Sequence, residues 1–299
     1  MDSAGLSWDL LGAFLAVMRT GSLSGASRTL GVAQPTVRRQ IETLEEVLGT
    51  VLFTRSQTGL TATEAAKATL PYAESMASVA EALVRSVSAP SAGEHGTVRV
   101  ACSEVMGVGA LPPMLADLRR AHPRIQIELS ASNANEDLLR RDADVAVRMA
   151  QPTQGALVAK RVGTVKLGVF AADSYLADHA VPRAVADLAD GHALVGKDRD
   201  TTFLGALAAA GLSLKRKDFA LRTDNDAAYI AALRAGVGIG ILQVPLAVGP
   251  PRLRRLLPKV SFDLPIWVVT HEDLRASRRV SIVFEHLVAS LTKYIRSAS

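Results

Sequence analysis

A short stretch near the N-terminus gathers polar side chains of the kinds that meet base edges and phosphates in nucleic-acid complexes: Gln34, Thr36, Arg38 and Arg39. Amide and hydroxyl groups match the hydrogen-bonding patterns of base edges, and guanidinium groups bind guanine or phosphate oxygens. Pro35 suits the first turn of a helix, where its missing N–H has no helical partner to lose. The stretch predicts DNA contact, with Gln34, Thr36 and Arg38 reading bases and Arg39 touching phosphate or groove.

The flanking apolar residues predict the helices that hold these side chains. A first helix ends at Gly31 and faces inward through Leu23, Ala26 and Leu30. A second helix starts at Gln34 and runs through Glu46, and its apolar residues recur at spacings of three and four. That buried stripe consists of Val37, Ile41, Leu44 and Leu48. An upstream helix carries a similar stripe of Leu10, Leu11, Phe14, Leu15 and Met18.

Two amphipathic helices joined by a glycine turn also occur in many folds that bind no DNA, so the flanking segments matter. The apolar run 51–53 precedes a polar, glycine-containing loop, and residues 60–61 follow it. Two short strands around such a loop make a wing that can reach a neighbouring groove or backbone. Arg55 and Thr58 lie on the expected wing and are predicted DNA contacts. The combination predicts a winged helix-turn-helix over residues 6–63.

The stretch 14–66 resembles the DNA-binding domain of the LysR-type transcriptional regulators nearly end to end. Matching residues include Gly21, Ser22, Ala26, Leu30, Val32, Gln34, Pro35, Arg39, Leu44, Leu48, Leu52, Phe53, Arg55 and Leu60. The family often has serine where this chain has Ala33 and Arg38. A missing hydroxyl at Ala33 forgoes a helix cap, at a cost of about 1 kcal/mol. Because Arg38 adds a charge to the reading face, target-sequence preference cannot be transferred from relatives.

An alanine-rich helix is expected over residues 64–88, followed by a hinge over 89–96 rich in Pro, Ser and Gly. The helix is apolar along one side and therefore needs a covering surface. That surface could belong to its own chain. The resemblance implies instead that this linker helix pairs with the same helix of a second subunit.

Beyond the hinge the sequence pattern changes to alternating strands and helices, which predicts a parallel α/β sheet. Strands are expected at 97–101, 125–129, 144–148, 165–171, 193–195, 219–222, 238–242 and 266–270. Helices are expected at 106–121, 135–141, 203–210, 226–235 and 277–295. This part resembles, more loosely, the LysR-type effector-binding domain of the periplasmic-binding-protein kind. The resemblance implies lobe I at about 97–164 and 266–299 and lobe II at about 165–265, with a ligand cleft between them.

Candidate effector contacts stand where strands end and helices begin, because ligands bind outside the carboxyl ends of parallel strands. Ser103 follows the first strand and by similarity occupies the position that most often touches effector. Glu104 beside it fits a ligand with a positive group or points to solvent. Arg148 ends an apolar strand and either binds a carboxylate ligand or pairs with a structural acid. Further candidates on the second lobe are Lys197, Thr202, Thr223 and Asn225.

The composition of the chain limits which partners and which kinds of chemistry can be expected. The net charge is +5, but residues 1–88 hold seven Lys/Arg against eight Asp/Glu, so DNA binding must come from local placement of arginines. The excess in residues 97–299, 27 against 20, either favours an anionic ligand or is a solvated surface. The six histidines are scattered without metal-ligand spacing, and no set of catalytic residues can be assembled. We therefore expect no metal, no cofactor and no enzymatic activity.

The single cysteine, Cys102, and the absence of a signal-like or membrane-length apolar run predict a cytoplasmic protein without a membrane partner. The leading hypothesis is a LysR-type regulator that binds double-stranded DNA as a homodimer or homotetramer under control of a small-molecule effector. RNA polymerase is left open as a further partner. The alternative is a two-lobed small-molecule-binding protein or enzyme with an N-terminal interaction domain.

Overall fold

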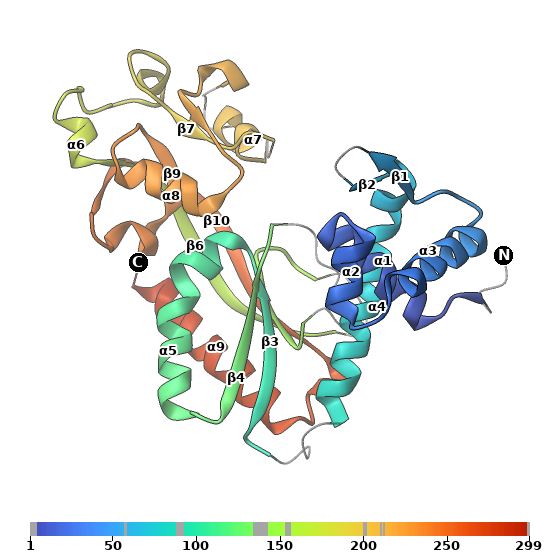
Figure 1. Cartoon of the computed structure of the whole chain (residues 1–299). Helices are drawn as coiled ribbons and strands as arrows, with labels where there is room; N and C mark the ends of the chain where they lie inside the picture. The colour runs from blue at the N-terminus through green and yellow to red at the C-terminus, as the bar shows by residue number, and fades with distance from the viewer. Residues whose placement is uncertain are drawn as a thin grey trace. The chain divides into compact units, whose positions relative to one another are not determined.

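The computed structural model describes residues 5–56, 59–87, 93–133, 143–152, 157–199, 202–209, 211 and 213–297. The chain divides into two compact units, the first formed mainly by residues up to Val84 and the second beginning at Arg85. Figure 1 shows the helical first unit and the sheet-based second unit. No helix within the described ranges combines the length and the apolar character that a membrane crossing requires.

The first unit is the predicted winged helix-turn-helix followed by a long helix. Its elements are α1 (Trp8–Thr20), α2 (Leu23–Leu30), α3 (Gln34–Leu48), β1 (Phe53–Ser56), β2 (Gly59–Ala62) and α4 (Glu64–Val87). The predicted stripe is confirmed, since Val37, Ile41 and Leu44 are buried against Phe14 and its neighbours on α1. The prediction that Leu30 faces inward is wrong. It is exposed because it is the last residue of α2, beside the open turn.

A left-handed turn links the two helices of the motif, and three hydrogen bonds fix the wing relative to them. The backbone at Gly31 is left-handed, with a φ of 68°, which ends α2 and turns the chain toward α3. The Glu45 carboxylate on α3 accepts hydrogen bonds from the N–H groups of Leu52 (2.6 Å) and Phe53 (3.1 Å). At the other end of the wing, the N–H of Leu60 donates to the Gly21 carbonyl at 3.0 Å. The first wing strand begins at Phe53, the last residue of the apolar run 51–53.

The second unit contains a six-stranded sheet with strand order β4-β3-β5-β10-β6-β9. These strands are β3 (Gly96–Cys102), β4 (Ile125–Ala131), β5 (Val145–Arg148), β6 (Leu157–Ala172), β9 (Gly240–Gln243) and β10 (Leu253–His271). The prediction of a parallel sheet holds for only part of this sheet. Strands β3, β4 and β5 are parallel, but β10 pairs antiparallel with both β5 and β6, and β9 pairs antiparallel with β6.

Two strands are far longer than predicted. β6 has 16 residues and β10 has 19, and Figure 1 shows both running from one lobe of the unit to the other. Register shifts between Leu256 and Ser261 and between Ile266 and Trp267 interrupt their pairing. The apolar pattern breaks between Leu256 and Ser261 and at the charged segment of β6, so each long strand looked like a short one. The crossing strands connect the two lobes.

Helices cover both lobes. In lobe I they are a π-helical turn (Met106–Ala110), α5 (Leu111–Ala121) and α9 (Arg278–Arg296), so the predicted helix 106–121 is not α-helical in its first turn. Lobe II carries α6 (Asp173–Leu176), α7 (Thr202–Ala209) and α8 (Asp226–Arg234). It also holds a two-stranded parallel sheet of β7 (Val195–Gly196) and β8 (Leu221–Arg222).

The other expectations for this unit are met in part. Strands expected at 193–195 and 219–222 are only two residues long, because the chain reaches them through irregular backbone. The helix expected at 135–141 lies outside the described residues, as does the first half of the expected hinge, residues 89–92. One large apolar cluster joins both lobes around α5, α8 and α9, and a smaller one fills lobe II around Tyr175, Leu194 and Ile239. The smaller cluster borders the site described below.

Candidate functional site

The outward side of α3 presents the predicted base-reading residues. Gln34, Pro35, Arg38 and Arg39 are exposed and Thr36 is half-buried. Val37, between them, is fully buried and anchors the helix to the core. Among the described residues, no carboxylate pairs with Arg38 or Arg39. Both guanidinium groups are exposed, and their binding to an anionic partner such as a phosphate stays a prediction.

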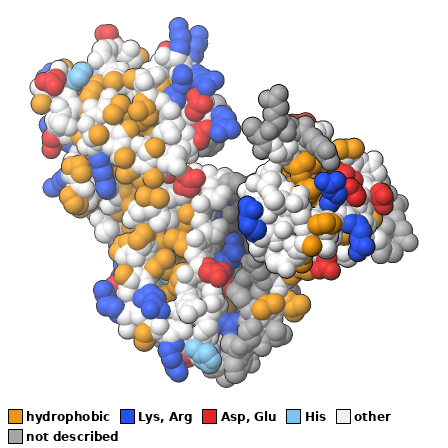
Figure 2. Space-filling model, in the orientation of Figure 1, with side chains coloured by type: hydrophobic (Ala, Val, Ile, Leu, Met, Phe, Trp, Pro, Cys, Tyr) orange, Lys and Arg blue, Asp and Glu red, His pale blue; other side chains and the backbone are white. Residues whose placement is uncertain are grey.

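Of the two predicted DNA contacts on the wing, the structure describes only the backbone of Arg55. Arg55 lies on β1 opposite Leu60 on β2, so its backbone is part of the wing. Its side chain, and Thr58 as a whole, fall outside the described residues. Both stay predictions. On the face seen in Figure 2, lysine and arginine side chains of both units are interspersed with acidic and apolar ones.

The helix caps differ between the two helices of the motif. The Ser22 hydroxyl accepts a hydrogen bond from the N–H of Gly25 at 3.1 Å and caps α2. Ala33 occupies the matching position before α3 with extended backbone and no side-chain cap. The expectation that Ala33 forgoes a cap is therefore confirmed.

In the second unit, the predicted effector residue Ser103 follows β3. Its hydroxyl oxygen is buried and has no hydrogen-bond partner among the described residues. A buried hydroxyl without a partner is costly, so this position is suited to a ligand that supplies one. Glu104 beside it does not point freely to solvent. Its carboxylate accepts a hydrogen bond from the N–H of Asp226 on α8 at 3.0 Å.

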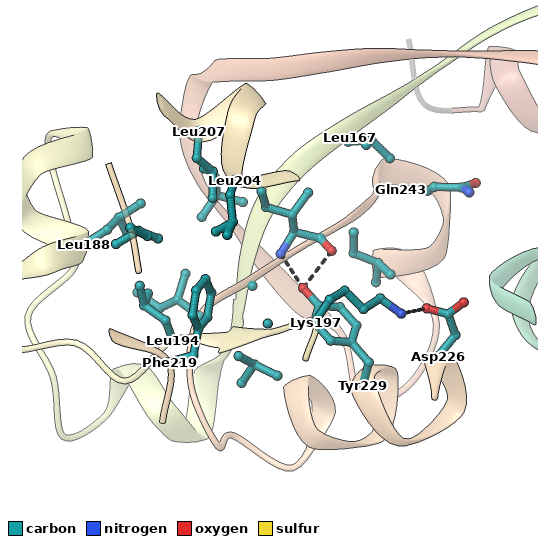
Figure 3. A pocket seen from close by; sticks show the side chains of 18 of the residues that line it. Leu167, Leu188, Leu194, Lys197, Leu204, Leu207, Phe219, Asp226, Tyr229 and Gln243 are labelled. Carbon is teal, nitrogen blue, oxygen red and sulfur yellow. Dashed lines mark hydrogen bonds and ion pairs between the residues drawn. The ribbon is translucent and has the colours of Figure 1, made fainter. Parts of the chain in front are cut away.

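Asp226 makes polar contacts with both lobes. Its carboxylate accepts a hydrogen bond from the Asn133 side chain at 2.8 Å and forms an ion pair with Lys197. The side chains of Lys197 and Asp226 are only 13% and 10% exposed, so the pair is largely withdrawn from water. The Lys197 ammonium also lies 5.4 Å from the ring centre of Tyr229. Figure 3 shows this ion pair beside Tyr229.

The remaining predicted effector residues are scattered. Arg148 ends β5 opposite Trp267 on β10. Asn225 caps α8 by accepting a hydrogen bond from the N–H of Ala228 at 2.8 Å, and Thr223 accepts one from the N–H of Asn225 at 3.1 Å. Both side chains are thus engaged within their own loop. The Thr202 side chain falls outside the described residues.

Sequence reasoning missed an apolar cavity of about 130 Å³ in lobe II. Its lining comes from several separate segments, and Lys197 is the only predicted effector residue on the described lining. Each lining leucine or isoleucine taken alone is typical of a core position, so the sequence offers no signal for the cavity. Within the described residues, no group of histidine, cysteine or carboxylate side chains could hold a metal ion.

A winged helix-turn-helix joined to a two-lobed α/β domain defines a DNA-binding transcription regulator with a ligand-binding domain. Residues 8–67 match the family model described as bacterial regulatory helix-turn-helix protein, lysR family, and residues 91–292 match the LysR substrate binding domain. The chain belongs to the LysR family. This family consists of transcriptional regulators, which favours the leading hypothesis over the alternative of a binding protein or enzyme.

The chain is also similar to a curated relative and, in its fold, to solved structures. The chain is 26% identical over 291 residues to the transcriptional activator TtdR of Escherichia coli K12, covering 95% of this chain and 94% of that protein. The fold matches the LysR family regulator CbnR with a TM-score of 0.69 at 21% identity, covering 95% of this chain and 99% of that one. It also matches the Vibrio cholerae virulence activator AphB, with a TM-score of 0.59, 22% identity and coverages of 95% and 99%.

Proposed function

We propose that α3 enters the major groove of double-stranded DNA, with Gln34, Thr36 and Arg38 facing bases and Arg39 facing phosphate. The exposed row of polar side chains above the buried Val37 carries this proposal. Arg55 and Thr58 on the wing would contact the adjacent backbone or groove. The protein acts in the cytoplasm, where its DNA target is available.

We also propose that the protein binds DNA as an oligomer paired through α4. Several large apolar side chains on this helix are 40% to 64% exposed: Tyr72, Met76, Val79, Leu83 and Val84. An exposed apolar strip of this kind favours contact with a second apolar surface. A second copy of the same helix provides such a surface, as the family resemblance implies.

The third element of the proposal is a small-molecule effector that binds between the lobes at Ser103. Support comes from the unpartnered Ser103 hydroxyl, buried among the described residues next to the inter-lobe contacts of Glu104 and Asp226. An effector acts only if it binds one arrangement of the lobes more tightly than another. Such a difference in affinity would change the arrangement of the DNA-binding units.

Selection from a library of random duplex DNA tests the DNA-binding proposal. The purified full chain is expected to enrich two copies of one short motif at a fixed spacing, because two recognition helices are held together. The matched control is the Gln34→Ala/Thr36→Ala variant, which is expected to lose the motif. Enrichment of no motif, or of the same motif by the variant, would refute the assignment of α3 as the reading helix.

A further inference from the structure

The cavity of lobe II is walled by apolar side chains from several elements. Figure 3 shows Leu188, Leu194, Leu204, Leu207 and Phe219 around it. At about 130 Å³ it is close in size to apolar cavities of about 150 Å³ that stay dry and bind benzene. The space is therefore large enough for one small ring or a branched alkyl group.

The polar side chains on the described lining are all engaged within the protein. Lys197 and Asp226 pair with each other. The Tyr229 hydroxyl accepts a hydrogen bond from the N–H of Ile241 at 2.8 Å and donates one to its carbonyl at 3.0 Å.

Gln243, the fourth polar residue on this lining, is equally satisfied. Its side-chain oxygen accepts a hydrogen bond from the Tyr294 hydroxyl at 2.6 Å, and its amide nitrogen lies 3.6 Å from the Met106 sulfur. A water or a polar ligand would therefore find few free partners on the described lining. The chemistry of the site selects an uncharged apolar molecule.

We propose that the lobe II cavity is a binding site for an uncharged, apolar small molecule about the size of a single aromatic ring. Ser103 does not line the cavity, whereas Lys197, one of the predicted effector residues, does. Val105 of lobe I and Leu207 of lobe II both line it. A bound molecule therefore contacts both lobes. It favours the arrangement of the lobes in which Val105 and Leu207 line the same cavity.

Titration of the full-length protein with toluene tests the proposal, followed through the methyl resonances of leucine by NMR. Saturable binding of one toluene per chain is expected, with contacts from the ring protons to the methyl groups of Leu194 and Leu207. The variant Leu204→Phe adds bulk at the cavity wall and is expected to bind toluene roughly tenfold more weakly. The matched control, Leu129→Phe, makes the same change at an exposed site on β4 and should bind as the wild type does.

Two results would overturn the proposal. One is the absence of saturable binding to the wild-type chain. The other is binding whose ring contacts involve neither Leu194 nor Leu207, which would place the ligand elsewhere. The contacts are measured on the wild-type chain, so this test holds even if Leu204→Phe fails to fold.

Discussion

Glu104, two residues after the end of β3, accepts a hydrogen bond of 3.0 Å from the backbone N–H of Asp226, the first residue of α8. The carboxylate also lies at the positive end of the α8 dipole. Asn133 adds a second inter-lobe bond by donating to the Asp226 side chain at 2.8 Å. Residues of lobe I thus bind both the first backbone N–H and the first side chain of α8, a helix of lobe II.

Loss of the Glu104 carboxylate is expected to loosen the start of α8. In Glu104→Ala the N–H of Asp226 loses its acceptor, so its hydrogen exchange should accelerate by roughly tenfold. Exchange measured by NMR checks this, with Glu128→Ala on the exposed side of β4 as control. An unchanged exchange rate at Asp226 would show that the bond does not hold the lobes together.

The Lys197–Asp226 pair should show strong coupling in unfolding experiments. Removing one partner, as in Asp226→Asn, leaves a buried charge and is expected to cost about 3 kcal/mol or more. The double variant Lys197→Met/Asp226→Asn should recover much of that loss. Unfolding in urea can be followed by tryptophan fluorescence in a Trp8→Phe background. Trp267 is then the only tryptophan in the sequence and reports on the second unit. Additive losses in the double variant would contradict the coupling.

Alkaline pH should destabilise the second unit through two buried tyrosines. Burial raises the pKa of Tyr229 and of Tyr294 above the usual value of 10.0. The stabilising contribution is therefore complete below pH 10.0 and is lost as the pH rises above it, because the unfolded chain ionises first. Each tyrosine contributes a slope of about 1.4 kcal/mol per pH unit. Urea unfolding of Tyr294→Phe should show a shallower loss than the wild type, and an equal loss would contradict the prediction.

Two substitutions at the N-terminal caps of α2 and α3 are expected to change stability in opposite directions. Ala33→Ser supplies the missing cap of α3 and should stabilise the first unit by about 1 kcal/mol, whereas Ser22→Ala should destabilise it by a similar amount. Hydrogen exchange of the capped helices measures both effects. Equal protection in the wild type and Ala33→Ser would show that α3 gains nothing from a cap.

Much of the fold of the first unit could be predicted from the sequence, because its helices are amphipathic and the contacts that define them are close in sequence. The spacing of Val37, Ile41 and Leu44 predicted their burial, and Gly31 predicted the turn. Leu30 was misassigned because helical spacing does not reveal where a helix leaves the core. The bonds of Glu45 to the wing could not be predicted, since they depend on the folded position of residues 52 and 53.

The second unit was harder to predict because its contacts are long-range. Strand spacing cannot distinguish parallel from antiparallel neighbours, so the antiparallel entry of β10 was missed. Asp226 lies 122 residues from Glu104, and nothing in the local pattern pairs them. The apolar cavity escaped for the same reason, since its lining is assembled from distant segments.

The most direct test of the account is the salt dependence of DNA binding by the wild type and Arg39→Ala, measured on a selected duplex and an unrelated one. We predict that Arg39→Ala weakens binding to both duplexes and lowers the slope of log affinity against log salt by about 1 per bound subunit. Lys67→Ala, which removes a cation paired with Glu64 on α4, serves as the control. Unchanged affinity and slope in Arg39→Ala would contradict the proposed docking of α3 on DNA.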